Sequence, residues 1–237
     1  TCNLNWASID NKPWQLGFIV IKNGKITDKH DFWLYWEDLK MSPTAAKMTG
    51  WTESKYKKLS VDPREPLDLF EKYLYDDEYI NVGHNILGFD IYIHGIYRRC
   101  LGKNPDYSYV KRSIDTVCLA KALKNDIKFC RDESFYSWQY KLNNMMDRKS
   151  KKKLIDLCHH YDIKIDESRL HDAMYDIEQN YEIFKKMIWE LDVWSKKFLN
   201  KNFFYSGRYV SYSHTSKFFF RQKSNLSGRY INNDIFK

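Results

Sequence analysis

The stretch from Leu170 to Asn180 holds the side chains best suited to acid–base and metal chemistry. His171 and Asp176 are five positions apart, about 140° around a helix of 3.6 residues per turn. They converge most easily if His171 lies at or before the first helical turn and Asp176 lies inside the helix. A mobile imidazole would then lie beside a fixed carboxylate, as expected of a general base next to a metal ligand. The alternative is a surface histidine and a solvated aspartate.

From Ala173 onward, apolar residues recur at steps of three and four, which places them on one face of a helix. They are Ala173, Ile177, Tyr181, Phe184, Ile188 and Leu191. We therefore predict a long amphipathic helix that carries Asp176.

A second group of polar residues lies between Gly83 and Asp90, where a predicted strand ends and a helix begins. Ligands commonly bind at such points in open α/β sheets. His84, Asn85, Phe89 and Asp90 are the candidates. Each also has a structural interpretation: Asp90 as a helix N-cap, Asn85 as a turn former and Phe89 as a core residue.

The elements that would position these residues alternate between strands and helices. Asn23-Gly24 predicts a two-residue hairpin turn, Ser42-Pro43 a helix start and Gly50 a helix end. Residues 125–146 are predicted to be a loop with partial helix. We predict strands at 16–21, 25–36, 79–82 and 110–114, and helices at 65–75, 91–100, 115–123, 151–161 and after His171. This order predicts an α/β fold with a sheet of mixed direction.

Composition narrows the class of protein. The chain has 237 residues, 43% of them apolar and 30% charged, as in soluble globular proteins. No apolar run approaches the ~20 residues of a membrane span, and no signal peptide is recognisable. Five scattered cysteines without a C-x-x-C pair indicate reduced thiols in an intracellular protein.

The net charge of +8 is concentrated near the end of the chain. Residues 196–237 contain nine Lys or Arg and one acidic residue, whereas residues 1–195 are neutral. A basic segment of this kind suggests a polyanionic partner.

The same segment contains a short repeat, in which Ser-Gly-Arg-Tyr occurs twice, 21 residues apart. We predict a small β appendage in which Arg208, Tyr209, Arg229 and Tyr230 contact single-stranded nucleic acid, because bases stack on aromatic side chains. The alternatives are a sheet packed on the main domain or a docking surface for a protein partner.

Together, these stretches resemble the DEDDh family of 3′→5′ exonucleases, the DnaQ-like branch of the RNase H-like fold, over roughly residues 1–191. G-H-N-I-L-G-F-D is similar to the second motif of the family, and H-D-A-M-Y-D is similar to its third, His-x4-Asp. Q-L-G-F-I-V-I-K-N-G-K-I, S-P-T-A-A-K-M-T-G-W-T, I-D-T-V-C-L-A-K-A-L and K-L-I-D-L-C-H-H-Y-D-I resemble the intervening segments.

The resemblance implies hydrolysis of phosphodiester bonds with two divalent ions, Mg²⁺ or Mn²⁺, typically ~4 Å apart. Asp90 and Asp176 would be metal ligands, and His171 would be the general base. His84, Asn85 and Phe89 would lie near the terminal nucleotide.

One motif of the family is missing at its expected place. No Asp-x-Glu pair occurs before Gln15, and the first glutamate is Glu37. We expect that the first strand and its two acids precede Thr1. The alternative is a degenerate, inactive relative.

The sequence therefore predicts an RNase H-like exonuclease domain at 1–195 and a basic aromatic extension at 196–237. The predicted activity is metal-dependent 3′→5′ cleavage of single-stranded nucleic acid, DNA more than RNA, in the cytoplasm or nucleoid. The alternative is a catalytically inactive nucleic-acid-binding or protein-docking module on the same fold.

Overall fold

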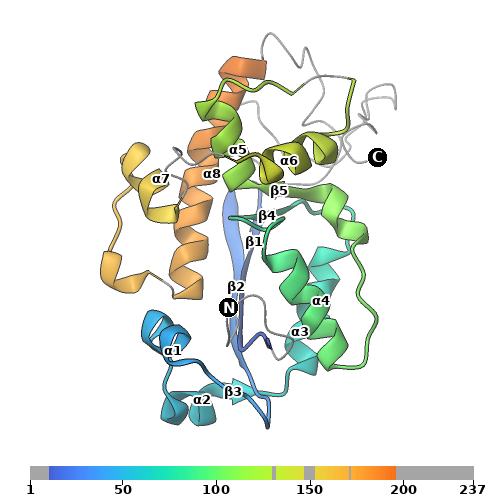
Figure 1. Ribbon diagram of the computed structural model, residues 1–237, viewed down its shortest axis with the longest axis vertical. Coiled ribbons are helices and arrows are strands. Elements are labelled where there is room, and N and C mark those ends of the chain that lie inside the picture. Colours follow the sequence, from blue (N-terminus) through green and yellow to red (C-terminus); the bar gives the residue numbers. More distant parts are fainter. Residues whose placement is uncertain (1–10, 130–131, 147–152, 171, 196–237) are drawn as a thin grey trace.

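The computed structural model of the chain describes residues 11–129, 132–146, 153–170 and 172–195 (Figure 1). Side chains at 188–189 and 191–195 are not described. Helices flank two small sheets, one with the strand order β1-β2-β3 and one that pairs β4 with β5. Antiparallel and parallel pairs both occur. The prediction of a mixed α/β fold is confirmed.

The first sheet is built on the predicted hairpin. β1 (Gln15–Lys22) pairs with β2 (Lys25–Leu34), and β3 (Ser60–Val61) extends β2 in parallel. Asn23 and Gly24 have φ values of 51° and 73°, as a type I′ turn requires. β2 ends two residues earlier than predicted, and the Tyr56 hydroxyl donates to the carbonyl oxygen of Leu34, its last residue, at 2.8 Å.

The second sheet pairs β4 (Asn81–Gly83) with β5 (Ser113–Asp115). A strand was predicted at 110–114, and this prediction is wrong for residues 110–112. These residues belong to a 3₁₀ helix (Ser108–Arg112). The Asp106 carboxylate accepts a hydrogen bond from the Ser108 amide at 2.9 Å and starts this turn. On β5, the Gln139 side chain accepts from the Asp115 amide and donates to the Ser113 carbonyl oxygen, each at 2.8 Å. The Gln139 side chain thus makes the two hydrogen bonds that the backbone of a neighbouring strand would otherwise make to β5.

The helices begin and end close to the predicted positions. Ser42 caps the first helix and Gly50, with a φ of 64°, ends it, as predicted. The segment 125–146 contains a complete helix, α6, capped by Ser134, where a loop with partial helix was predicted. The helices are α1 (Pro43–Thr49), α2 (Glu53–Leu59), α3 (Arg64–Leu74), α4 (Asp90–Cys100), α5 (Thr116–Lys124), α6 (Phe135–Asn144), α7 (Leu154–His160) and α8 (Ala173–Ser195), with a 3₁₀ turn at Glu167–Arg169.

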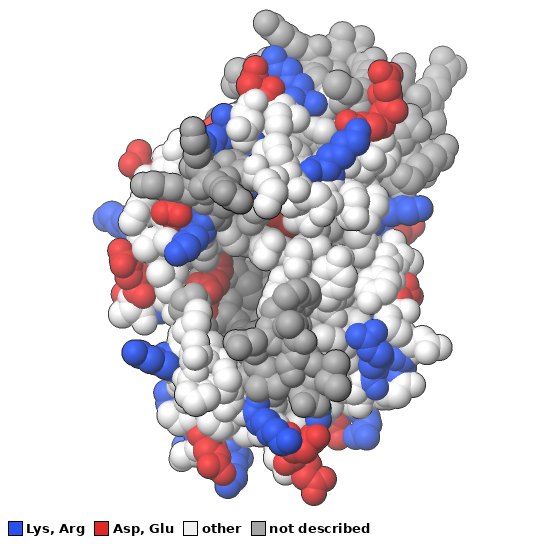
Figure 2. All heavy atoms as spheres, in the orientation of Figure 1, with Lys and Arg blue, Asp and Glu red and all other residues white. Residues whose placement is uncertain are grey.

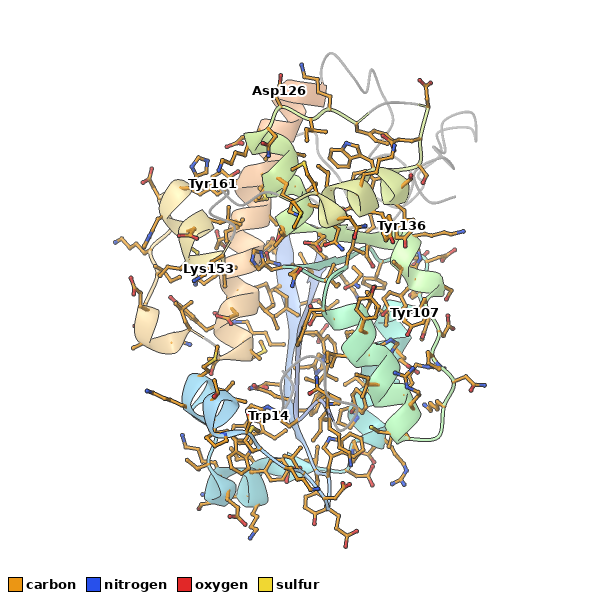
Figure 3. All side chains as sticks on the ribbon, viewed as in Figure 1. Trp14, Tyr107, Asp126, Tyr136, Lys153 and Tyr161 are labelled. Atoms are coloured by element: carbon orange, nitrogen blue, oxygen red, sulfur yellow. The ribbon has the colours of Figure 1, made fainter. Side chains whose placement is uncertain are left out.

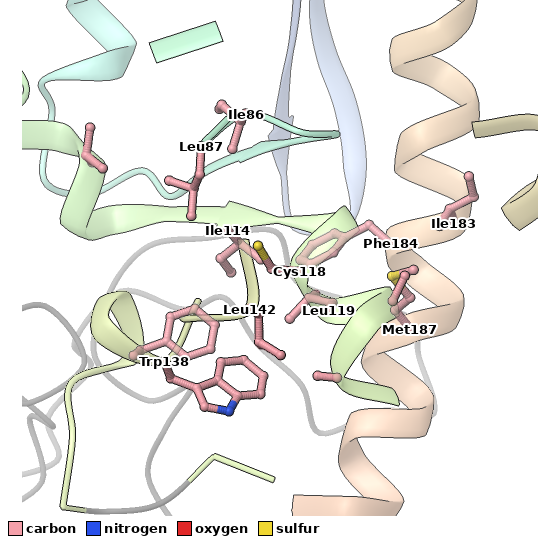
Figure 4. Close-up of a cluster of buried hydrophobic side chains, with 14 of the residues drawn as sticks. Ile86, Leu87, Ile114, Cys118, Leu119, Trp138, Leu142, Ile183, Phe184 and Met187 are labelled. Carbon is pink, nitrogen blue, oxygen red and sulfur yellow. The ribbon is translucent and has the colours of Figure 1, made fainter. Parts of the chain in front are cut away.

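The larger core lies among β5, α5, α6 and α8 (Figure 4). Tyr181 and Phe184 are buried, as the predicted face of α8 requires, but Ile183 and Met187 are also fully buried. α8 packs against β1, α5 and α7 and so buries more than one face. Within the described part of the chain, no helix is long and apolar enough to cross a bilayer. The cysteines at 100, 118 and 158 are free thiols.

Candidate functional site

The loop that follows β4 is fixed by a buried carboxylate. Asp115, at the end of β5, accepts hydrogen bonds from the backbone amides of Asn85 at 2.9 Å, Leu87 at 3.0 Å and Val117 at 2.8 Å. The Val117 bond caps α5, and the other two bonds hold residues 85–87 against the sheet. Asn85 has a φ of 62°, which confirms its prediction as a turn former.

Burial affects the charge on Asp115. It raises the pKa of the carboxyl, and the amide hydrogen bonds, led by that of Leu87, act in the opposite direction because they stabilise the ionised form. Asp115 therefore organises the loop from inside the protein, where solvent does not reach it.

A second set of hydrogen bonds connects this loop to α8. The Thr116 hydroxyl donates to Oδ1 of Asn180 at 2.8 Å, and Nδ1 of His84 lies 3.0 Å from the same hydroxyl oxygen. A hydroxyl has one proton to give, so we assign the proton in the contact with His84 to Nδ1. The carbonyl oxygen of Gly83 lies further from the hydroxyl, at 3.3 Å. One buried threonine thus joins the end of β4 to α8.

Asp176 lies one turn before Asn180 on α8, so the two residues share a helix face. Asp176 is half-buried. α8 approaches β1 closely at Gly17, where an added Cβ would lie 3.0 Å from Ile177 and 3.3 Å from Ala173. Glycine at this position allows the first turns of α8, and with them Asp176, to lie against the sheet. The prediction that Asp176 lies inside the helix is confirmed.

Asp90 is the first residue of α4 and is exposed. The alternative role as N-cap is wrong, because Phe89 occupies the cap position and makes no side-chain cap bond. Solvent reaches Asp90, yet the surrounding protein limits hydration of its carboxyl group. This desolvation, together with the charge of Asp115, raises the pKa of Asp90 to about 6. Phe89 is half-buried, as is His84.

Asp90 and Asp176 have the donor chemistry of a site for a hard divalent cation, because both offer carboxylate oxygens. Within residues 11–129, 132–146, 153–170 and 172–195, no three His, Cys, Asp or Glu side chains form a group that could hold a metal ion. Asp90 and Asp176 alone are too few ligands for a metal site among these residues. His171 and the extension residues Arg208, Tyr209, Arg229 and Tyr230 lie outside the described residues.

Comparison with known proteins decides the family. The family model described as Exonuclease (RNase_T) matches residues 4–184. This chain belongs to the exonuclease family. The resemblance to the DEDDh exonucleases is thereby confirmed. A search of curated proteins finds no match.

A solved structure shares the exonuclease fold. Its title is "3'-end specific recognition of histone mRNA stem-loop by 3'-exonuclease", and it superimposes with a TM-score of 0.55 at 12% sequence identity. The match covers 80% of this chain and 79% of the other. This similarity supports the fold, and recognition of an mRNA stem-loop is a property of that protein.

Sequence reasoning missed three residues that position the second and third exonuclease motifs: Asp115, Thr116 and Asn180. Asp115 was placed at a helix start, which is the typical place for a capping carboxylate. That position could have revealed its role toward Val117, but not the bonds to Asn85 and Leu87, which depend on tertiary structure. Asn180 lies inside a helix, where the sequence gives no sign that it is buried.

Proposed function

We propose that this member of the exonuclease family hydrolyses phosphodiester bonds at the 3′ end of single-stranded nucleic acid and requires Mg²⁺ or Mn²⁺. The hydrogen-bonded connection from His84 through Thr116 to Asn180 carries the proposal. It ties the strand before the second motif to the helix of the third motif, as a shared active site requires.

The roles of the residues follow from their chemistry. Asp90 and Asp176 would hold the divalent ions, which supply Lewis-acid activation of water and charge stabilisation at the leaving oxygen. His171 takes a proton from the water whose oxygen attacks phosphorus, a task suited to a near-neutral pKa. The bond to the 3′ oxygen of the preceding nucleotide breaks, and one nucleotide is released.

The loop beyond β4 would position the terminal nucleotide. Asn85 and His84 are held by Asp115 and Thr116 before any substrate arrives. Groups fixed in advance lose little freedom when the substrate binds. Phe89 would pack against the terminal nucleotide beside Asp90.

Residues 1–195 would form the exonuclease domain of an intracellular protein. Residues 196–237 would add a basic surface in which Arg208, Tyr209, Arg229 and Tyr230 contact the strand. We take DNA as the first candidate substrate. RNA is the second, because the solved structure with the same fold concerns recognition of a histone mRNA stem-loop.

A cleavage assay tests the proposal. The full gene product is incubated with 5′-labelled single-stranded DNA or RNA in Mg²⁺, Mn²⁺ or EDTA, beside His171→Ala. We expect a metal-dependent ladder of shortened products that is lost in the variant and is stronger on DNA. Intact strands that are retarded on a native gel would instead support the inactive nucleic-acid-binding module. Intact strands without binding would support a protein-docking role.

A further inference from the structure

Four tyrosines on and beside α4 and α6 lie next to the candidate site, three of them exposed and Tyr136 half-buried. We call Tyr92, Tyr107, Tyr136 and Tyr140 the tyrosine stripe. Tyr140 is 54% exposed, Tyr92 45% and Tyr107 44%. Single exposed aromatic side chains are common, but several that lie together on one surface often mark a binding site.

Contacts between the rings define the course of the stripe. The ring centroids of Tyr136 and Tyr140, one turn apart on α6, are separated by 6.2 Å. Burial raises the pKa of Tyr136, and the phenols of Tyr140 and of Tyr92 on α4 raise it further, which is consistent with Tyr92 facing the start of α6. The Tyr107 hydroxyl lies close to Gly95 of α4, because a Cβ added to this glycine would be 2.6 Å from it. Gly95 is three positions after Tyr92, so Tyr107 covers the next turn of the helix. Figure 3 shows Tyr136 and Tyr107 on the same side of the molecule.

One end of the stripe meets the loop beyond β4. Tyr136, Tyr140 and Asn143 are spaced by four and three positions and so share one face of α6. The side chains of Asn143 and Asn85 both approach Gly88. A Cβ added to this glycine would lie 3.5 Å from Oδ1 of Asn143 and 2.5 Å from Oδ1 of Asn85. The face of α6 that bears the tyrosines therefore reaches the loop that contains Asn85.

Charged side chains of both signs lie around the stripe. Figure 2 shows uncharged side chains on the side of the molecule where α6 lies, with Lys, Arg, Asp and Glu side chains scattered around them. Lys141, next to Tyr140 on α6, is exposed and pairs with Glu133 at 2.6 Å. Aromatic faces bordered by basic side chains suit a single strand, whose bases stack while its phosphates meet the cations.

We propose that the tyrosine stripe binds the nucleotides that precede the 3′ end of a single-stranded substrate and so makes the enzyme prefer long strands. The inference rests on the proposed function and adds the path of the strand. Nucleotides beyond the terminal one would cross from the Asn85 loop over α6 and α4. Tyrosine suits this task because its ring stacks on any base, so the preference would concern length and not sequence.

The test measures affinity as a function of strand length. Fluorescently labelled single strands, from a dinucleotide upward, are titrated with the full protein in EDTA, which prevents metal-dependent cleavage. We expect the affinity of the natural protein to rise with length. We expect Tyr92→Ala with Tyr140→Ala to lower affinity for long strands by about tenfold or more, since stacking of one base contributes ~1–3 kcal/mol.

Matched variants separate stacking from damage to the fold. Tyr92→Phe with Tyr140→Phe keeps the rings and should bind like the natural protein. Tyr35→Ala is the control, because Tyr35 is 49% exposed and lies on the loop after β2, away from α6 (Figure 1). Thermal unfolding of all variants reports on their stability.

The outcomes separate the stripe from the active site. If the alanine variant binds long strands like the natural protein while cleavage persists, the stripe proposal is overturned and the exonuclease assignment stands. A protein partner would then be the occupant to seek. If the natural protein neither binds nor cleaves any strand, both proposals fail together. Loss of long-strand affinity with normal cleavage of the shortest substrates would establish the stripe.

Discussion

The Thr116 hydroxyl donates a 2.8 Å hydrogen bond to Asn180 and joins α5 to α8 across 64 positions of sequence. Thr116 is inaccessible to solvent and Asn180 is 8% exposed. Neither polar group can turn to water if the other is removed. The bond therefore contributes to stability and also sets the position of α8 relative to the end of β4.

Thr116→Val should destabilise the protein by about 1–3 kcal/mol, because Oδ1 of Asn180 would remain buried without this donor. The contact with His84 would also be lost, and cleavage should fall. Urea unfolding and the cleavage assay measure the two effects. Thr27→Val is the control, since Thr27 is exposed on β2, and should change stability by less than about 0.5 kcal/mol. Equal stability of the two variants would contradict the prediction.

Asp90→Asn should reduce cleavage by at least about 100-fold, because loss of a metal-binding carboxylate removes several kcal/mol of transition-state stabilisation. The fold should survive, since Asp90 is exposed. Asp126→Asn changes an exposed aspartate with a φ of 48°, a conformation that asparagine also adopts, and should leave cleavage unchanged. Equal cleavage by both variants would remove Asp90 from the active site.

Lys121→Met should destabilise the protein by about 1–3 kcal/mol. The buried ammonium group of Lys121 donates to the carbonyl oxygens of Leu142 at 2.6 Å, Asn143 at 2.9 Å and Met145 at 3.2 Å, and so holds the end of α6. We also expect weaker binding of long strands, because α6 carries Tyr140. Thermal unfolding and strand titration measure both effects. The matched change Lys124→Met, at an exposed position of the same helix, should have little effect, and a similar loss in both variants would refute the prediction.

Stability should fall as the solution is acidified from pH 7 to pH 5, and His94 should account for part of that fall. Burial lowers the pKa of His94 below its ordinary value of 6.5, although the hydrogen bond from Nε2 to Glu71 at 3.0 Å opposes this. Arg98 also lowers the pKa and Asp106 raises it, while the Tyr109 hydroxyl contacts Nδ1 at 3.2 Å.

The sign of the effect follows from proton binding. Below pH 6.5 the unfolded chain binds a proton at this histidine more readily than the folded protein, so acid favours unfolding. A tenfold difference in proton affinity corresponds to about 1.4 kcal/mol. His94→Gln should make the dependence of unfolding free energy on pH shallower between pH 7 and pH 5. An unchanged or steeper dependence in urea unfolding would rule out this role of His94.

Local patterns predicted the elements that local chemistry determines. The turn at Asn23-Gly24 and the helix between Ser42 and Gly50 depend on residues within a few positions, and both were predicted correctly. The helix that carries Asp176 was also predicted, because its apolar period is long.

Features that depend on tertiary contacts were not predictable. The apolar period of α6 is short, with only Phe135, Trp138 and Leu142 at steps of three and four. The end of this helix is fixed by Lys121 from another helix. The buried roles of Asp115 and Asn180 became visible only when β5, α5 and α8 were placed together. The helix that carries Asp176 was therefore predictable from sequence, whereas the hydrogen bonds that support the candidate site were not.

The Gln139 side chain that completes β5 has a consequence for self-association. An uncovered strand edge offers amides and carbonyls that can template pairing with a second molecule. Gln139 is inaccessible to solvent and occupies the Asp115 amide and the Ser113 carbonyl oxygen itself. β5 therefore cannot add a strand from another copy at these groups without first displacing a buried side chain, so a single glutamine protects this edge against intermolecular sheet growth.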